Sequence, residues 1–281
     1  MMHSAKDFKR QAQTTLFYLA ISLLAAAVLM PFVWMVSTSF KGENAIRTLP
    51  IQWLPENPSL EGYRRVFDMA GFSFPRAAFN SLLLAVLSTG VSVLSASMAA
   101  FVFAKIPFRN SNKLFGLFLA TMMIPGTVTM IPNYIILRYL GLLDTYTGLI
   151  LPSLSNAFGV FLMRQAILTV NDSYLESALL DGASLRRVFF RIVLPMVMPT
   201  LSTMILLSFM GSWNSYLWPL IVLSSNEKKT LQVVLGNMNT QYDRKEHVLM
   251  AGAVLTILPI FAVYLLTQRH VDAGIAIGGL K

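Results

Sequence analysis

The chain has 281 residues, of which 55% are hydrophobic and only 12% are charged. Soluble domains usually carry about a quarter Asp, Glu, Lys and Arg, and the mean hydropathy here is +0.61. This composition lacks the charge that a water-exposed surface needs, so it indicates a protein whose main solvent is the lipid bilayer.

Several chemistries are excluded or disfavoured at the outset. The sequence contains no cysteine, which removes disulfides, thiolate metal sites and cysteine nucleophiles. Its three histidines, His3, His247 and His270, lie far apart and outside every long apolar run, so no metal site is expected. The net charge of +9 is spread between apolar runs and is not interleaved with aromatic residues. It therefore indicates membrane orientation and not nucleic-acid binding.

Six apolar segments are long enough to span a membrane. Roughly 20 apolar residues cross a hydrocarbon core of about 30 Å, and the segments lie at about 14–38, 79–104, 114–137, 145–163, 196–223 and 248–268. The first follows Lys6, Lys9 and Arg10, as a signal peptide would. Its apolar run is too long for a signal peptide, so we predict a retained first helix.

The distribution of basic residues favours both termini on the cytoplasmic side. The inner connection between the second and third segments then holds Lys105, Arg109 and Lys113, whereas the short outer connection that follows the third holds only Arg138. Short loops rich in Lys and Arg stay in the cytoplasm. The chain is therefore predicted to be a multi-pass membrane protein; its residence in the cytoplasmic (inner) membrane of a bacterium or archaeon is implied by the family resemblance described below.

No Asp, Glu, Lys or Arg lies inside any of the six segments. Pumps and proton-coupled carriers usually hold ionisable groups at membrane depth, so proton coupling within this chain is not expected. The segments do contain small and neutral polar residues. Small residues recur every three or four positions in the second segment, which favours helix packing, although a hydrophilic pathway is the alternative. The members of this stripe are Ser81, Ala85, Ser88, Ser92, Ala96 and Ala99. Pro125 and Pro132 predict a bend in the third segment.

A cytoplasmic stretch at about 171–195 separates the fourth and fifth segments. Its pattern predicts helix–turn–helix: Leu175, Leu179 and Leu180 form an apolar edge, Gly182 ends the first helix, and Ser184 caps the second, which should end before Pro195. An amphipathic helix lying on the lipid surface is the alternative.

At these residues the sequence resembles a known family. Glu-x-Ala-x-x-x-Gly, followed after nine residues by Ile-x-Leu-Pro, is the cytoplasmic signature of permease subunits in binding-protein-dependent ABC importers. It is present here as Glu176, Ala178, Gly182, Ile192, Leu194 and Pro195. Ser177 stands where the signature usually has a second alanine, a departure that bears on how tightly the helix docks.

The resemblance covers almost the whole chain. Residues 213–220 (WNSYLWPL) look like the fifth-helix motif of the family's carbohydrate branch, and the stretches 123–132 and 141–145 are similar too. The ending at 274–281 resembles the glycine-rich tail of the smaller permease subunit of the maltose transporter.

This resemblance implies an all-α polytopic membrane protein with the six-helix fold of type I importer permeases. It implies an N-terminal segment at 1–78, a transmembrane domain at 79–268 that includes the coupling loop, and a cytoplasmic tail at 269–281. The ATPase-coupling residues would be Glu176, Ser177, Ala178, Asp181 and Gly182. The partners would be a second homologous permease, two ATPase subunits and an extracytoplasmic solute-binding protein that delivers a sugar or oligosaccharide.

No cofactor is expected in this chain. The sequence has no G-x-x-x-x-G-K-[ST], so ATP and magnesium would be bound by the partner subunits and the chain itself is not expected to be an enzyme. Three other functions remain open: an importer permease for a different neutral or polar solute, a self-contained channel or facilitator, and a membrane enzyme. The enzyme is disfavoured because no nucleophile–base or metal set lies near a membrane face.

The neutral polar residues of the third and fifth segments suit a sugar pathway. Trp213 and Trp218 lie near the outer end of the fifth segment, where tryptophan belts anchor helices, and a belt position is the expectation for Trp218. Asn133, Tyr134 and Asn214 are predicted to form a shallow neutral site that holds sugar hydroxyls during passage.

Alanine at Asn133, Tyr134 or Asn214 should therefore weaken uptake several-fold without abolishing it. Loss of one neutral hydrogen bond typically costs about 0.5–1.5 kcal/mol, and assembly and basal ATP hydrolysis should stay intact. The measurement is uptake by each variant, with the receptor's affinity for the sugar determined separately. Wild-type rates in all three variants would place the site in the partner permease.

Overall fold

A computed structural model describes residues 2–46, 52–68, 71–241 and 246–278. Every regular element within these ranges is helical, which confirms the predicted all-α class for the described residues. The chain divides into two compact units. The first comprises Met1–Met69 with Met238–Leu255, and the second comprises Ala70–Asn237 with Thr256–Lys281.

The first unit contains α1 (Met2–Ser39), α2 (Glu43–Ile46), α3 (Glu61–Phe67) and the beginning of α15 (Glu246–Gly278). Just beyond α1, the Lys41 side chain is buried. Its ammonium lies 4.0 Å from the centroid of the Trp34 ring and donates to the carbonyl of Gln52 over 2.5 Å. Burial lowers the pKa of Lys41, and the aromatic face and the carbonyl stabilise the charge that burial disfavours.

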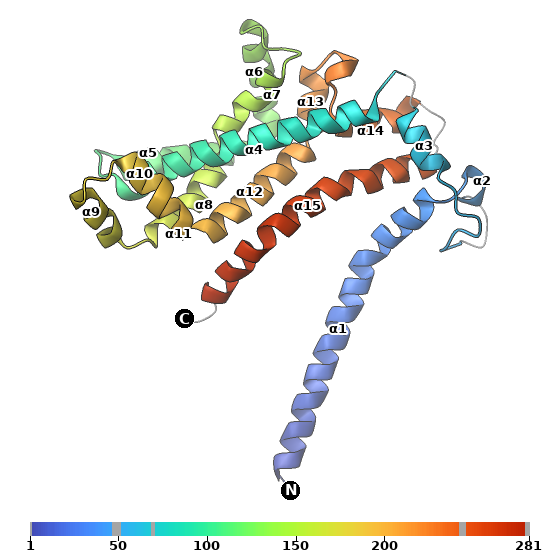
Figure 1. Cartoon of the computed structure of the whole chain (residues 1–281), viewed down its shortest axis with the longest axis horizontal. Coiled ribbons are helices and arrows are strands. Elements are labelled where there is room, and N and C mark those ends of the chain that lie inside the picture. Colours follow the sequence, from blue (N-terminus) through green and yellow to red (C-terminus); the bar gives the residue numbers. More distant parts are fainter. Residues whose placement is uncertain (1, 47–51, 69–70, 242–245, 279–281) are drawn as a thin grey trace. The chain divides into compact units, whose positions relative to one another are not determined.

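The second unit is organised around α4 (Phe74–Lys105), which packs along α8 (Ala157–Leu168) and α12 (Met198–Trp213) (Figure 1). The predicted small-residue stripe makes this contact: Ser81, Ala85, Ser88, Ser92 and Ala96 are all buried. Small side chains let backbones approach closely in lipid, where no hydrophobic force drives helices together. Ala96 and Ala99 pack in the apolar core as the packing interpretation predicts, whereas Ser81, Ser88 and Ser92 line the cavity described below.

The remaining elements of this unit are short. They are α5 (Ser111–Ala120), the 3₁₀ turn η1 (Thr121–Met123), α6 (Gly126–Tyr139), α7 (Tyr146–Ile150), the 3₁₀ turn η2 (Leu151–Leu154), α9 (Asp172–Leu180), α10 (Leu185–Val188), the π-helical turn η3 (Phe189–Val193), α11 (Leu194–Met196), α13 (Leu217–Val222) and the 3₁₀ turn η4 (Asn226–Lys228). The helix α14 (Leu231–Gln241) begins in the second unit and ends in the first.

Three described helices are individually long and apolar enough to cross a membrane: Gln13–Ser39, Phe74–Lys105 and Glu246–Arg269. Three further candidates are bent pairs, Ser111–Met123 with Gly126–Tyr139, Tyr146–Leu154 with Ala157–Leu168, and Leu185–Met196 with Met198–Trp213. Six candidate spans therefore exist if each pair counts as one, as the sequence predicts, although half of them are broken.

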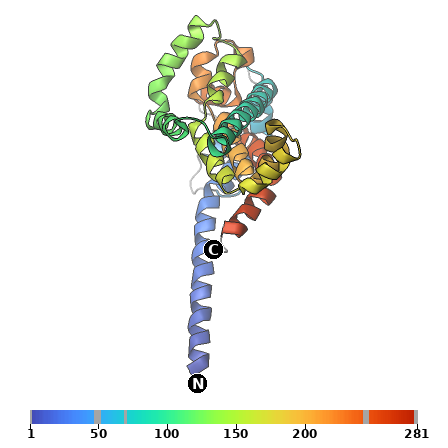
Figure 2. The ribbon, with the colours of Figure 1, turned by 90° about the vertical axis from the view of Figure 1, so that its left-hand side faces the viewer.

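Proline explains the first of these breaks. Pro125 precedes α6, and the residue before it, Ile124, is extended at φ −86° and ψ 116°, because proline disfavours a helical residue before it. The helices on either side meet at 98° (Figure 2). The predicted bend is confirmed, and it falls at Pro125, since Pro132 lies inside α6.

The prediction of one continuous helix over 196–223 is wrong. α12 ends at Trp213, and α13 begins only at Leu217. In an unbroken helix the ring of Pro219 would clash with the carbonyl of Ser215. The helix restarts instead with Pro219 in its first turn, where no backbone donor is needed.

Gly62 is required where α3 meets backbone from two other helices. A Cβ atom at this position would lie 2.8 Å from the carbonyl oxygen of His247 and 3.1 Å from that of Ser39. Gly62→Ala should therefore lower the stability of the first unit by about 1–3 kcal/mol through overpacking. Thermal unfolding in detergent measures this effect.

Gly42→Ala is the matched control in the same unit, because a Cβ atom there meets nothing within 4 Å. It should leave the unfolding midpoint close to that of the wild type. Equal midpoints for the two variants would contradict the close approach at Gly62.

Candidate functional site

The predicted helix–turn–helix is present in the stretch at about 171–195. α9 starts with the Asn171 side chain accepting a hydrogen bond from the Ser173 amide (3.0 Å). It ends in a Schellman turn, in which the amide of Ala183 donates to the carbonyl of Ala178 (2.9 Å) and that of Gly182 to Leu179 (3.0 Å). Gly182 has φ +78°, a conformation that glycine adopts without steric cost.

The five predicted coupling residues lie together on this element. Glu176, Ser177, Asp181 and Gly182 are exposed, whereas Ala178 is half-buried against the apolar core of the second unit. The Ser177 hydroxyl donates to the carbonyl of Ser173 within the same helix (2.8 Å). The departure from alanine at this position therefore leaves no unpaired hydroxyl at the surface.

The apolar edge of α9 is divided between core and surface. Leu175 is buried, Leu179 is 45% exposed, and Leu180 is 89% exposed at the tip of the turn. Leu179 and Leu180 together leave an apolar edge exposed beside the acidic Asp181.

Lys105 fixes the start of this stretch to α4, and Arg164 connects α8 to α4 and α5. The side chain of Lys105, at the end of α4, is 4% exposed, and its ammonium donates to the Val170 carbonyl and to the Asp172 carboxylate, each over 2.6 Å. The Arg164 guanidinium of α8 lies 4.2 Å from the centroid of the Phe115 ring and donates to the Phe103 carbonyl over 3.2 Å. The start of α9 is thereby tied to α4.

The second helix of the stretch does not end before Pro195, contrary to prediction. Ser184 caps α10 as predicted, accepting from the Arg187 amide (3.3 Å). The helical path then continues through the π turn η3, where the Leu194 amide bonds to the Phe189 carbonyl, five residues back. A widened turn lets the Pro195 ring avoid the carbonyl four residues before it. The path bends by 86° into α12.

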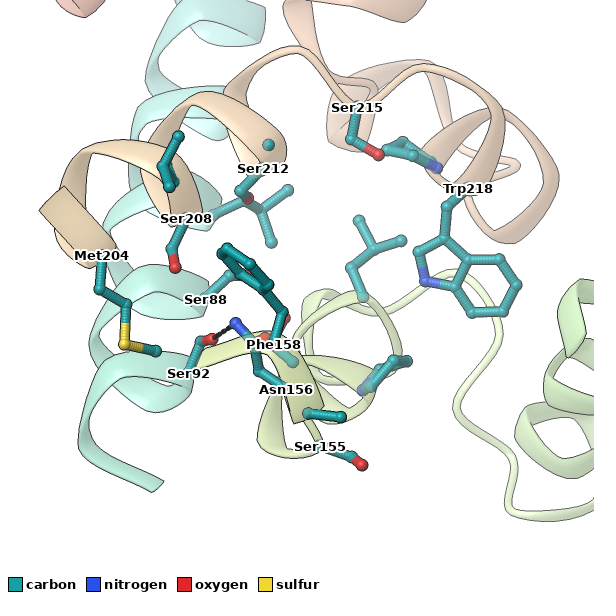
Figure 3. A pocket seen from close by; sticks show the side chains of 18 of the residues that line it. Ser88, Ser92, Ser155, Asn156, Phe158, Met204, Ser208, Ser212, Ser215 and Trp218 are labelled. Atoms are coloured by element: carbon teal, nitrogen blue, oxygen red, sulfur yellow. Dashed lines mark hydrogen bonds between the residues drawn. The ribbon is translucent and has the colours of Figure 1, made fainter. Parts of the chain in front are cut away.

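A cavity of about 610 Å³ lies inside the second unit, and we call it the chamber. Its walls come from α4, from η2 and the start of α8, and from α12 and α13 (Figure 3). Asn156 caps α8 by accepting from the Gly159 amide (2.8 Å) and donates to the Ser92 hydroxyl of α4 (2.8 Å). None of the lining residues is charged. The polar lining residues are Ser81, Ser88, Ser92, Thr121, Ser153, Ser155, Asn156, Ser208, Ser212, Ser215 and Thr230.

The three residues predicted for the pathway are not brought together in the chamber. Asn133 and Tyr134 are half-buried on α6, and Asn214 is exposed where α12 ends. Their contribution to a sugar site stays a prediction. Sequence reasoning missed Asn156, although an asparagine directly before an apolar run is a helix-start signal.

The tryptophan positions differ from a membrane belt. Trp213 is 2% exposed, its ring stacks on Phe209 with centroids 6.0 Å apart, and its indole N–H donates to the Thr256 carbonyl (3.1 Å). Trp218 lines the chamber, and its indole nitrogen is shielded from solvent. Both rings therefore pack within the second unit, Trp213 against Phe209 and Trp218 along the chamber wall.

A carboxylate outside the spans connects the turn after α6 to the segment after α13. Asp144 has a positive φ of 55°, and its side chain accepts from the Ser225 hydroxyl (2.5 Å), the amides of Ser224 and Ser225 (both 3.0 Å) and the Lys228 ammonium (2.9 Å). These hydrogen bonds, that of the Ser225 hydroxyl first, hold the pKa of Asp144 far below its usual range.

Comparison with known proteins identifies the family. A family model described as "Binding-protein-dependent transport system inner membrane component" matches residues 92–277. The arabinooligosaccharides transport system permease protein AraQ of Bacillus subtilis is 33% identical over all of this chain and 99% of that protein. The chain belongs to this family of membrane permeases.

The solved structures agree with this assignment. A bacterial ABC transporter involved in the import of the acidic polysaccharide alginate contains a chain with a TM-score of 0.83 and 25% identity, covering 92% of this permease and 96% of that chain. The bacterial alginate transporter in complex with an alginate pentasaccharide-bound periplasmic protein has a TM-score of 0.53 at 17% identity, covering 95% of this permease and 97% of that chain. The fold is that of type I ABC importer permeases, in a multi-pass membrane protein.

The matched region, residues 92–277, includes the helix–turn–helix α9–Gly182–α10 and all of α12, whereas Ser81 and Ser88 of the chamber wall precede it. The chain runs from α10 through η3 and α11 and bends at Val197 into α12, which lines the chamber.

Asp144→Asn tests the polar connection at Asp144. Asparagine tolerates the positive φ but loses the charge, so the variant should be less stable at pH 7 by about 1–2 kcal/mol. Because the folded pKa is depressed, the stabilisation is present above the unfolded pKa of about 3.9. It should be lost only as the pH falls below that value, so the two unfolding midpoints should differ by a constant amount from pH 5 to 8 and converge in stronger acid.

Glu227→Gln is the control for this experiment. Its ion pair with Arg76 is open to solvent, with side chains 73% and 56% exposed, and such pairs contribute about 0–1 kcal/mol. A larger loss of stability in Glu227→Gln than in Asp144→Asn would contradict the stabilising role assigned to the Asp144 carboxylate.

Proposed function

We propose that this permease forms the membrane pathway of an ATP-driven importer for a sugar or oligosaccharide, together with a second homologous permease. Two ATPase subunits bind ATP and magnesium and dock on the cytoplasmic side, where both termini of this chain lie. A solute-binding protein delivers the substrate from the other side. The observation that carries the proposal is the coupling element, a short helix ending in a leucine that is 89% exposed.

The coupling element suits a protein partner better than a lipid surface. Leu179 and Leu180 offer apolar contact, while Glu176 and Asp181 on the same short helix offer two negative charges. An amphipathic helix that lies on a membrane carries basic residues on its polar face. α9 has none, whereas α10 carries Arg186 and Arg187, so the argument against a lipid surface applies to α9. Charge repulsion from anionic headgroups therefore favours docking of α9 into an ATPase cleft.

The firm attachment of the element supports force transmission. Its inner face is held by Leu175 and Ala178 in the apolar core, and its start is held by Lys105. Closure of the ATPase pair would therefore move α4 and α12 with the element. A loosely tethered loop would absorb the same movement.

The substrate class is supported by relatives and by charge. AraQ is named for arabinooligosaccharides, and the alginate transporter is described as importing an acidic polysaccharide. Saccharides are the class common to both. The uncharged chamber and the absence of ionisable residues from the six predicted spans favour a neutral saccharide for this chain. The receptor partner is supported by the alginate complex, whose described contents include a periplasmic protein.

Gly182→Asp tests the coupling role. A Cβ atom at this position meets nothing within 4 Å, so the variant should insert and assemble, at a backbone cost of about 1–2 kcal/mol. The added charge and the altered turn should reduce substrate-stimulated ATP hydrolysis and uptake by at least tenfold. Both activities are measured on the assembled complex with its receptor in proteoliposomes, with ATP inside.

Gly182→Asn is the matched control, because asparagine has nearly the same shape and tolerates positive φ without adding charge. It should retain most of the activity. Normal coupled activity in an assembled Gly182→Asp complex would overturn the proposal. Uptake that continues without any ATPase subunit would instead support a facilitator.

A further inference from the structure

The chamber contains more polar groups than the fold uses. The Ser81 hydroxyl accepts from the Leu231 amide (2.7 Å), and Ser92 pairs with Asn156. In the described part of the chain, the hydroxyls of Ser88, Ser208 and Ser212 form no hydrogen bond. Figure 3 shows these three from α4 and α12 on one side of the chamber and Trp218 on the other. Free hydroxyls that face a cavity are available to a guest.

Two lining groups are buried without a partner. The Thr230 side chain is only 5% exposed, and its hydroxyl oxygen has no hydrogen-bond partner among the described residues. The indole nitrogen of Trp218 is also buried and has no hydrogen-bond partner among the described residues. A buried polar group without a partner costs about 1–3 kcal/mol, and such groups in native proteins usually bond to a protein group, water or ligand. Both residues line the chamber, so a ligand there can supply the missing partner.

The chemistry of the chamber selects the kind of guest. An ion would be held without a counter-charge, since none of the lining residues is charged. A purely apolar guest would leave the hydroxyls and the indole N–H unpaired. Hydroxyl donors and acceptors beside the aromatic rings of Phe158 and Trp218 match a sugar ring, which has hydroxyls at its edge and C–H groups on its faces. The volume of about 610 Å³ falls within the usual range for small-ligand sites, roughly 300–1,000 Å³.

We propose that this subunit itself binds one end of an uncharged saccharide in the chamber, with the Trp218 N–H and the Thr230 hydroxyl as hydrogen-bonding partners of the sugar. Ser88, Ser208 and Ser212 complete the polar wall. The inference rests on the proposed function and deepens it, because it places a solute site within this permease. The site is separate from the one predicted at Asn133, Tyr134 and Asn214. α12 connects it to the coupling element, so ATPase closure can reshape the site that holds the sugar.

The test removes one polar group in each variant. Thr230→Val replaces the hydroxyl with a methyl group of nearly the same shape, and Trp218→Phe removes the indole N–H together with part of the ring. Each is assembled into the full transporter with its receptor, and ATP-driven uptake is measured with arabinotriose, lactose and an acidic alginate trisaccharide as probes. For a neutral probe that the wild type imports, each variant should raise the concentration for half-maximal uptake about two- to tenfold, the effect of one lost hydrogen bond.

Thr89→Val and Ser97→Ala are the matched controls. Both residues carry buried hydroxyls on α4 that have no hydrogen-bond partner among the described residues, and neither lines the chamber. They should transport as the wild type does. If the controls lose as much activity as the chamber variants, or if the chamber variants match the wild type, the inference is overturned.

A second measurement does not depend on transport. Because the chain has no cysteine, Ser212→Cys introduces one thiol into the chamber and Asn226→Cys one thiol at an exposed position outside both sites. The transported saccharide should slow maleimide labelling at position 212 and leave labelling at 226 unchanged. Equal labelling with and without the saccharide at 212 would exclude the site even if Trp218→Phe fails to assemble. A wild-type complex that imports none of the probes would refute the proposed function, and with it this inference.

Discussion

The close approach of α8 and α12 to α4 is the interaction on which the second unit depends. In lipid, association of helices rests on van der Waals contact and on a few polar bonds. Alanine and serine along one stripe of α4 permit that contact. The same packing buries Ala96, Ala100 and Phe101 together with Met163 of α8 and Met204 of α12. A larger residue in the stripe would separate the helices that carry both the coupling element and the chamber.

The stripe also changes character along α4. Towards the C-terminal end of α4 it is apolar, and it joins the core that holds Leu175, Val188 and Val193 of the stretch at 171–195. Further along, Ser88 and Ser92 face the chamber. The C-terminal part of α4 therefore takes part in a close-packed apolar core, while residues nearer its start line a polar cavity. A rigid connection at one end and a cavity at the other are what a mechanically driven pathway requires, because displacement has to be transmitted before it can change the shape of a site.

The breaks in the other helices follow from a second constraint. Hydrocarbon cannot bond a free amide or carbonyl, so non-helical backbone at membrane depth has to be buried in protein or face a polar cavity. The interruption between α12 and α13 satisfies this condition, because Ser215 and Trp218 line the chamber. The break between η2 and α8 satisfies it too, since its two non-helical residues, Ser155 and Asn156, both line the chamber. Proline at 219 makes the first break necessary, and the chamber makes it tolerable.

By itself the sequence determined the all-helical membrane class, the six apolar segments, the bend at Pro125 and the turn at Gly182. Each of these depends on neighbouring residues: on apolar run length, on the missing amide of proline, or on the freedom of glycine at positive φ. The family signature at 176–195 located the coupling element for the same reason. Tertiary structure alone decided that Trp213 is buried, that Asp144 collects four hydrogen bonds, and that Ser88, Asn156, Ser212, Trp218 and Thr230 surround one cavity. These residues come from four separate stretches of the chain, and no local pattern states which faces of their helices meet.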